Sequence, residues 1–217
     1  MNTNNALDRL NGLLPLADNQ RRLEAPLRDL HKKVLQDFVA RGHPPSCEEM
    51  EQLPGDYPLD DALQQLASGD LVVLSQDRQS ISGAYPFTVE ERVHTLSVNG
   101  HRLHAMCALD ALSVAPMFQV ATTVKSRCHV TGDPVEVEMQ GGNVLSASPA
   151  EPLVGIRWQG TSGCAAQSLC LDMVFLRDRE TAGDWQAQDS GNISILDLPS
   201  AVAMGAAFFG PLLEQSD

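Results

Sequence analysis

A run of apolar residues at 103–116, LHAMCALDALSVAP, constrains the fold of this chain more than any other stretch. We expect the run to form a helix, and a helix that is apolar on every side is normally buried. Asp110 is its only carboxylate, and aspartate is rarely fully buried without a partner. The helix face that carries Asp110 would also carry Leu103, Met106, Cys107 and Val114. Asp110 is therefore expected either to pair with a polar group or to lie in a pocket where its charge is used.

The same run also suits a simple core helix, in which Asp110 caps a neighbouring element and Cys107 only packs. Free cysteine behaves as a small hydrophobic residue and is among the most buried residue types. Buried groups with perturbed ionisation mark functional sites often, but not always. The rest of the chain must therefore decide between the two interpretations.

Length and composition predict an ordinary globular protein. The 217 residues, of which 43% are hydrophobic, suffice for one large domain or two small ones. No stretch reaches the roughly 18 apolar residues of a membrane helix, and we see no pattern of a secretory signal. The five cysteines, an odd count without an export signal, predict reduced thiols in the cytoplasm. The formal net charge of -13 argues against binding nucleic acid or anionic membranes.

The N-terminal part is expected to be helical and to end in a pair of strands. Residues 1–20 read as a loose arm or short helix, and helices are predicted at 22–41, after the capping box at 46–49, and at about 58–68. Strands follow at 71–74 and 81–87. This order is typical of a winged helix, which often binds DNA. We expect a structural module instead, because the second and third helices lack Lys and Arg and carry Glu48, Glu49, Glu51, Asp60 and Asp61.

The remainder alternates between short strands and turns. Residues 168–176 alternate most clearly, with Cys170 on the face opposite Leu169 and Met173. Further strands are predicted at 92–98, 120–128, 135–139, 144–147, 153–158 and 193–196, and helices at 180–188 and 199–213. The fold class is therefore α+β: a three-helix winged-helix-like domain at 1–88, then a mixed β-sheet domain with flanking helices at 89–217.

Standard catalytic signatures are absent from the sequence. It contains no P-loop, no GxGxxG after a strand, no HExxH, no GxSxG and no CxxC. A zinc site with Cys107, His101 and His104 is conceivable, but the spacing fits no common template. A Cys107–His104–Asp110 nucleophile is also conceivable, although His104 would point away from Cys107 on a helix.

Cysteines and one carboxylate remain as the candidate chemistry of the strand-rich half. Cys107 lies in the apolar run, Cys128 at a strand end and Cys170 in the expected strand at 168–176. Thiolates are soft ligands that select soft metals. A carboxyl group in an apolar pocket has a raised pKa and can act as a general acid.

Four motifs, in order and spacing, resemble the organomercurial lyase (alkylmercury lyase) family. They are LHAMCALD at 103–110, SRC at 126–128 with TGDPV at 131–135, SLC at 168–170, and Asp184-Trp185. The resemblance extends from about residue 59 to residue 209, and CALD is its most specific part. It implies a helical, winged-helix-like N-terminal domain followed by a mixed sheet domain, in agreement with the periodicity.

The resemblance also implies roles for individual residues. The catalytic cysteine pair and aspartate would be Cys107, Cys170 and Asp110, and Cys128 would be a largely structural cysteine. Two positions depart from the family pattern. Met106 stands where an aromatic residue is often found, and Leu171 follows Cys170 where some members carry a second cysteine. Cys47 and Cys164 match no family motif and are interpreted as incidental.

The implied reaction is protonolysis of a carbon–mercury bond, which gives a hydrocarbon and Hg(II), as in mercury resistance and detoxification. Two thiolates would hold mercury as substrate and product, and Asp110 would pass a proton from a cysteine to the carbon. No added cofactor is implied, but free thiols are needed for turnover, and Hg(II) would pass to a mercuric reductase or to cytosolic thiols. A member that acts on another organometal, or a non-enzymatic thiol-based metal-binding or regulatory protein, stays open as an alternative.

Overall fold

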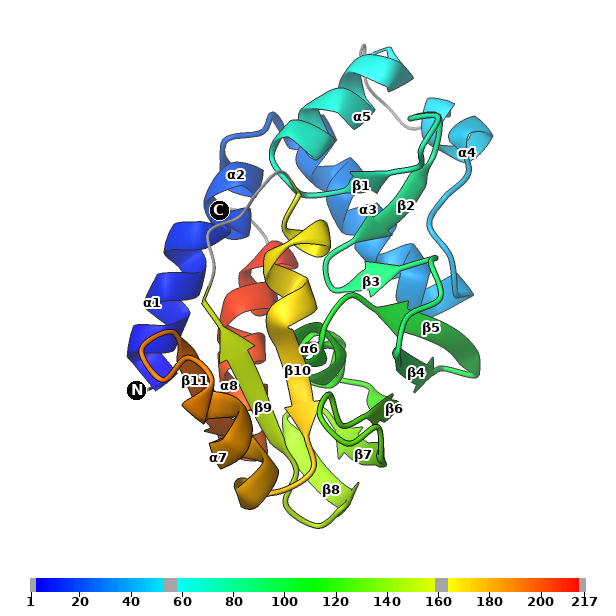
Figure 1. The fold of residues 1–217 in the computed structure, drawn as a ribbon. Helices are drawn as coiled ribbons and strands as arrows, with labels where there is room; N and C mark the ends of the chain where they lie inside the picture. The colour runs from blue at the N-terminus through cyan, green and yellow to red at the C-terminus, as the bar shows by residue number, and fades with distance from the viewer. Residues whose placement is uncertain (1–2, 53–57, 159–163, 215–217) are drawn as a thin grey trace.

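Helix α6 (Ala108–Phe118) lies at the centre of the protein, whose computed structural model describes residues 3–52, 58–158 and 164–214. Residues 108–117 are all buried, as the apolar run predicts. The helix starts later than expected, because Leu103 belongs to strand β5 (His101–Ala105) rather than to the helix. Figure 1 shows α6 between the strands β4 to β7 on one side and β9, β10 and helix α8 on the other.

The described residues form two antiparallel sheets, which flank this helix. The larger sheet has the strand order β1-β2-β3-β5-β4-β6-β7-β8, and the smaller one has the order β10-β9-β11. A parallel bridge between Cys128 and Phe175 joins the two sheets beside α6. The strands are β1 (Val73–Leu74), β2 (Ile81–Ala84), β3 (Phe87–Thr88), β4 (His94–Val98), β5, β6 (Ala121–Arg127), β7 (Pro134–Gln140), β8 (Asn143–Ser148), β9 (Leu153–Arg157), β10 (Met173–Leu176) and β11 (Ile193–Asp197).

In the described part of the chain, five helices precede the strands. The stretch expected as a loose arm or short helix contains α1 and α2, and the three predicted helices are present as α3, α4 and α5. Ser46 and Glu49 form the predicted capping box at the start of α4. Strand β3 pairs with β5, so the larger sheet continues across the domain boundary expected between residues 88 and 89. The bounds are α1 (Thr3–Leu13), α2 (Leu16–Arg21), α3 (Ala25–Arg41), α4 (Cys47–Glu51) and α5 (Leu59–Ser68).

The C-terminal elements close the structure against the N-terminal helices. Helix α8 (Leu198–Phe209) packs on α6 and α1, and the following turn lies beside α2 (Figure 1). Gly205 of α8 allows close packing, because a Cβ there would lie 3.0 Å from Cβ of Ser113. The remaining elements are the 3₁₀ helices η1 (Ala165–Gln167), η2 (Leu169–Asp172) and η3 (Gly210–Leu212), and helix α7 (Arg179–Ala187).

A buried network of hydrogen bonds links the N-terminal helices to the C-terminal elements. Gln20 Nε2 lies 2.8 Å from His31 Nδ1 and donates to the Leu212 carbonyl oxygen at 2.9 Å. His31 Nε2 lies 3.1 Å from the Leu71 carbonyl oxygen. Burial lowers the pKa of His31 to about 4, so its ring is neutral at physiological pH. Within the described ranges, no helix combines the length and the apolar character needed to cross a bilayer.

Candidate active site

Cys107 stands at the junction between strand β5 and helix α6. It is the N-cap of α6 with an extended backbone (φ -150°, ψ 176°), and its sulfur accepts a hydrogen bond from the Asp110 backbone N–H at 3.3 Å. Asp, Asn, Ser or Thr usually provides this contact. A cysteine in this place satisfies a helix N–H, and its sulfur lies at the N-terminal end of α6.

Asp110 lies in the first turn of α6 and is almost fully buried, with 1% of its surface exposed. Its Oδ2 atom is buried without a hydrogen-bond partner among the described residues. Burial raises the pKa of Asp110 to about 7, although hydrogen bonds from Cys107 lower it. The carboxyl group therefore gains and loses a proton near neutral pH, as a proton shuttle requires.

Cys170 lies on η2, and the strand predicted for 168–176 is wrong in its first half. Residues 169–172 form the 3₁₀ helix, and only residues 173–176 form strand β10. Side chains from a distant part of the sequence hold the backbone that leads into η2. The Asp70 carboxylate accepts from the Ala165 N–H at 3.1 Å, and the Tyr85 hydroxyl accepts from the Ala166 N–H at 2.7 Å.

The fold brings Cys107, Asp110 and Cys170 together. One ligand atom of each lies within 4.8 Å of the others, and all three side chains are buried. In the part of the chain that the structure describes, no other group of three or more His, Cys, Asp or Glu residues has this geometry. The three predicted site residues therefore form a single constellation with two soft donors and one carboxylate.

Both thiols are protonated in this environment. Burial raises the pKa of Cys107 well above its ordinary value, with smaller contributions from its neighbours Cys170 and Asp110. For Cys170, the hydrogen bond with Cys107 lowers the pKa, but burial and the negative charges of Asp110 and Asp70 raise it further, so the net direction is upward. Metal binding must therefore displace protons from the sulfurs, and Asp110 is the nearby group able to accept one.

A pocket of about 330 Å³ leads to Cys170 but stops short of Cys107 and Asp110. Met106 and Met173 line this pocket, and Met173 Sδ lies 3.7 Å from Cys107 Sγ. Methionine is flexible and unbranched, so these side chains can move aside when a ligand enters. Gly83 makes room for Met106, because a Cβ at this position would lie 2.5 Å from the methionine Cε.

Cys128 lines the same pocket, in the turn after β6. Its backbone N–H donates to the Asp133 carbonyl oxygen at 2.8 Å, and the next N–H, of His129, donates to Phe175 at 2.8 Å. These bonds hold the turn against β10. Burial raises the pKa of Cys128, but hydrogen bonds from Thr131 and from backbone groups lower it by more, and the net direction is downward.

The other candidates from the sequence lie outside this constellation. His101 Nε2 lies 3.1 Å from the Ala40 carbonyl oxygen, and His104 Nδ1 lies 3.1 Å from the Arg92 carbonyl oxygen. Among the described residues, neither histidine has a ring nitrogen in the group of ligand atoms that contains Cys107 and Asp110, which argues against the zinc site and the cysteine–histidine nucleophile. Cys47 donates to the Gln79 carbonyl oxygen at 2.8 Å, and Cys164 donates to Asp70 at 3.2 Å.

Sequence reasoning missed Asp70, Tyr85 and Met173. Asp70 and Tyr85 act on a segment about 80 to 95 residues away, and no local pattern shows that link. Met173 was expected only as one member of an alternating strand. In the structure its side chain lines the pocket and its Sδ lies 3.7 Å from Cys107 Sγ, a contact that strand alternation does not predict.

Comparisons with known proteins point to one family. A family model described as alkylmercury lyase matches residues 87–210. A curated alkylmercury lyase of Pseudomonas putida is 30% identical over 130 residues, which cover 60% of this chain and 61% of that protein. One of Bacillus cereus is 26% identical over 176 residues, which cover 81% of this chain and 78% of that protein. A crystal structure titled as the mercury-bound form of MerB2 matches 92% of this chain and 98% of the other, with a TM-score of 0.77 and 19% identity.

Proposed function

Because this chain belongs to the alkylmercury lyase family, we propose that it is an organomercurial lyase with Cys107, Cys170 and Asp110 as its catalytic residues. The observation that carries the proposal is the buried cluster of two thiols and one carboxylate within 4.8 Å. Thiolates bind mercury because both are soft. The enzyme would convert a substrate R–Hg–X to the hydrocarbon R–H and Hg(II).

The first step is capture of mercury by Cys170, since this thiol lines the pocket and Cys107 does not. When the substrate is bound to a thiol, R–Hg–S–R′ exchanges with Cys170–SH to give Cys170–S–Hg–R and R′–SH. One mercury–sulfur bond breaks and another forms, and the cysteine proton leaves on R′–SH. Movement of the Met173 side chain away from Cys107 would then allow the mercury on Cys170 to reach the Cys107 sulfur.

The second step breaks the carbon–mercury bond. Cys107 gives its proton to Asp110 and binds mercury, which raises the coordination number and places electron density on the carbon. Asp110 delivers the proton to that carbon, R–H leaves, and Hg(II) stays between the two sulfurs. A carboxyl group with a pKa of about 7 suits both halves of this transfer. Serine at either sulfur position would be too hard a ligand.

The chain would divide into a structural module and a catalytic domain. Helices α3 to α5 with β1 and β2 would form a structural, winged-helix-like module at 1–88, and 89–217 would be the catalytic domain. Cys128 would have a structural role, supported by the bonds that hold its turn on β10. The protein would work in the cytoplasm without an added cofactor, away from nucleic acid and membranes. Hg(II) would pass to a mercuric reductase or to cytosolic thiols.

Hydrocarbon detection tests the proposal most directly. Reduced protein is mixed with phenylmercury and excess thiol, and benzene is measured by gas chromatography. We expect release by the wild type and nearly complete loss in Cys107→Ser and in Cys170→Ser. Cys47→Ser is the matched control, because this thiol bonds to Gln79 outside the site and should not affect release.

Two results would contradict the assignment. Undiminished benzene release by either active-site variant would exclude that cysteine from the chemistry. Stoichiometric binding of Hg(II) by the wild type without any hydrocarbon would identify a metal-binding protein instead of a lyase. Comparison of phenylmercury with organotin and organolead compounds distinguishes a mercury enzyme from one that acts on another organometal.

A further inference from the structure

The pocket that reaches Cys170 is cationic, although the chain as a whole is strongly acidic. The chain has 28 acidic and 15 basic side chains. Arg92 and Arg127 line the pocket, and none of its lining residues is Asp or Glu. A lining of this kind attracts anions. The positive charge of the lining would not stabilise an organomercury cation, so we expect it to bind another, anionic part of the incoming ligand.

Arg127 is the cation best placed to bind such a group. Its side chain is exposed at the end of β6, and one N–H of the guanidinium donates to the Gly132 carbonyl oxygen at 2.9 Å. No carboxylate of the described residues lies within ion-pair distance of it. Asp133, the nearest acid in sequence after Gly132, is paired with Arg177 and accepts from Thr131. The other guanidinium N–H groups of Arg127 therefore remain for a ligand.

The guanidinium group of Arg92 is a second hydrogen-bond donor in the pocket, and only part of it has a partner. One of its terminal nitrogens pairs with Glu90 at 2.7 Å, and its Nε is buried without a partner among the described residues. His94 also lines the pocket, but burial and the charge of Arg92 lower the pKa of its ring to about 4. Because Glu90 offsets the charge of Arg92, Arg127 is the arginine of the pocket lining that has no ion-pair partner among the described residues.

Soft mercury in a solution that contains thiols exists as a thiolate complex R–Hg–S–R′. The pocket volume of about 330 Å³ lies within the usual range for small-molecule sites. It leaves space for the carrier thiol beside a small organomercury group. Val93 and Leu171, both about half exposed at the same pocket, offer an apolar surface for the organic group.

We propose that this pocket binds the organomercurial as the adduct of a small thiol that bears a carboxylate, with Arg127 holding that carboxylate. The proposal rests on the proposed function and names the form in which the substrate arrives. Binding at Arg127 places the mercury–sulfur bond near Cys170. Thiol exchange then follows: Cys170–SH takes R–Hg, and the carrier leaves as the protonated thiol R′–SH.

The test compares two carriers on the full-length protein. Phenylmercury is supplied as its adduct with 3-mercaptopropionate, which is anionic, or with 3-mercaptopropionamide, which is neutral, and kcat/KM for benzene release is measured. The ratio of kcat/KM between the carriers is then compared in wild type, Arg127→Gln and Arg127→Lys. Differences in intrinsic thiol reactivity cancel when the same two carriers are used on every variant.

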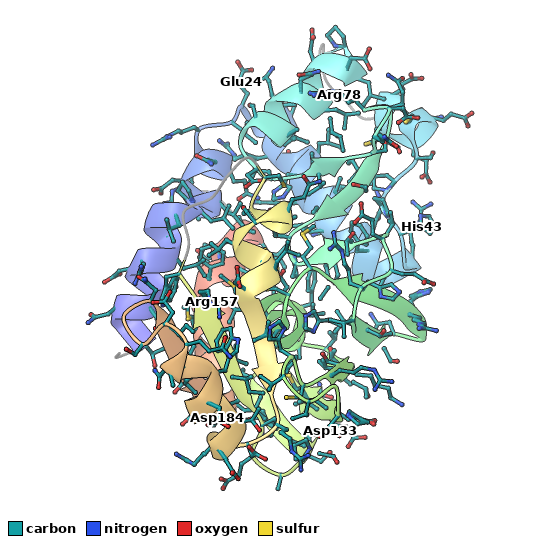
Figure 2. All side chains as sticks on the ribbon, in the orientation of Figure 1. Glu24, His43, Arg78, Asp133, Arg157 and Asp184 are labelled. Carbon is teal, nitrogen blue, oxygen red and sulfur yellow. The ribbon has the colours of Figure 1, made fainter. Side chains whose placement is uncertain are left out.

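We expect Arg127→Gln to lower kcat/KM roughly threefold to fivefold on the anionic adduct and to leave the neutral adduct unchanged, the range of an exposed ion pair. Arg127→Lys keeps the charge and should keep most of the preference. Added salt should weaken the preference of the wild type. Arg78→Gln is the control that removes one charge far from the pocket: Figure 2 labels Arg78 at the opposite end of the molecule from Asp133.

Other outcomes overturn the inference. An equal carrier ratio in wild type and Arg127→Gln, or an equal loss on both carriers, would show that Arg127 does not recognise the carboxylate. The same holds if Arg78→Gln changes the ratio as much as Arg127→Gln does. If the wild type released no benzene from both adducts, the proposed function itself would be refuted. Failure of the carrier proposal and failure of the proposed function are therefore distinguishable.

Discussion

Replacement of Asp110 by asparagine should change how the stability of this protein depends on pH. The folded protein holds the carboxyl group with a pKa of about 7, against 3.8 as the ordinary value for an unfolded chain. Between these values the folded state binds a proton that the unfolded state has lost. The free energy of unfolding therefore falls as pH rises from about 4 to about 7, and the loss is complete above the folded pKa.

The size of the loss follows from the same two values. At 1.36 kcal/mol per pH unit, a rise of roughly three units destabilises the folded protein by about 4 kcal/mol at high pH. Roughly 2 to 3 kcal/mol of that loss falls between pH 5 and pH 8. Asparagine does not titrate, so the variant lacks this part of the pH dependence. Cys107 and Cys170 stay protonated across the range because their pKa values are raised.

Urea denaturation followed by tryptophan fluorescence at pH 5, 6, 7 and 8 measures the effect. The quantity of interest is the change in the stability difference between wild type and Asp110→Asn with pH. This difference cancels any constant cost of burying an amide. We expect the variant to gain on the wild type as pH rises. Parallel pH profiles for the two proteins would refute the claim that Asp110 is a carboxyl group with a raised pKa.

Two further predictions concern packing around the site. Gly155→Ala should destabilise the protein by about 1 to 3 kcal/mol, because a Cβ would lie 2.4 Å from Cζ3 of Trp185. Gly183→Ala on α7, where a Cβ would meet no atom within 4 Å, should instead stabilise it by about 0.5 to 1 kcal/mol. Urea midpoints that shift in the same direction for both variants would contradict the close packing of Gly155 against Trp185. Tyr85→Phe should lower stability by about 1 to 3 kcal/mol through an unpaired backbone N–H of Ala166, and should speed the alkylation of Cys170 by iodoacetamide; an unchanged alkylation rate would show that Tyr85 does not restrain the Cys170 segment.

Local periodicity predicts the elements whose burial is regular along the chain. Helix α3 and strands β6 and β7 follow the expected patterns, since each buries one continuous face. Periodicity predicts too early a start for α6, because an apolar run suits a buried strand as well as a buried helix. Cysteine is also not a common N-cap, so Cys107 gave no local signal of a helix start.

The site was predictable only in part for a related reason. Residues 168–176 alternate like a strand, yet Leu171 is 52% exposed and Cys170 is 4% exposed on a 3₁₀ turn. Hydrogen bonds to Asp70 and Tyr85 fix the approach to that turn, and such long-range contacts leave no trace in local sequence patterns. The juxtaposition of Cys170 with Cys107 was therefore expected only from family resemblance, not from periodicity.

The hydrogen bonds from Gln20 to Leu212 and from Lys32 to the Glu214 carbonyl oxygen have a consequence for biosynthesis. Helices α2 and α3 leave the ribosome long before the segment at 212–214 that they contact. The nascent chain therefore cannot complete this helical layer until that segment has been synthesised, and α6 with its thiols is not covered until α8 follows. A chain that terminates before α8 should thus be an unstable product that proteases remove, rather than a shortened but working protein.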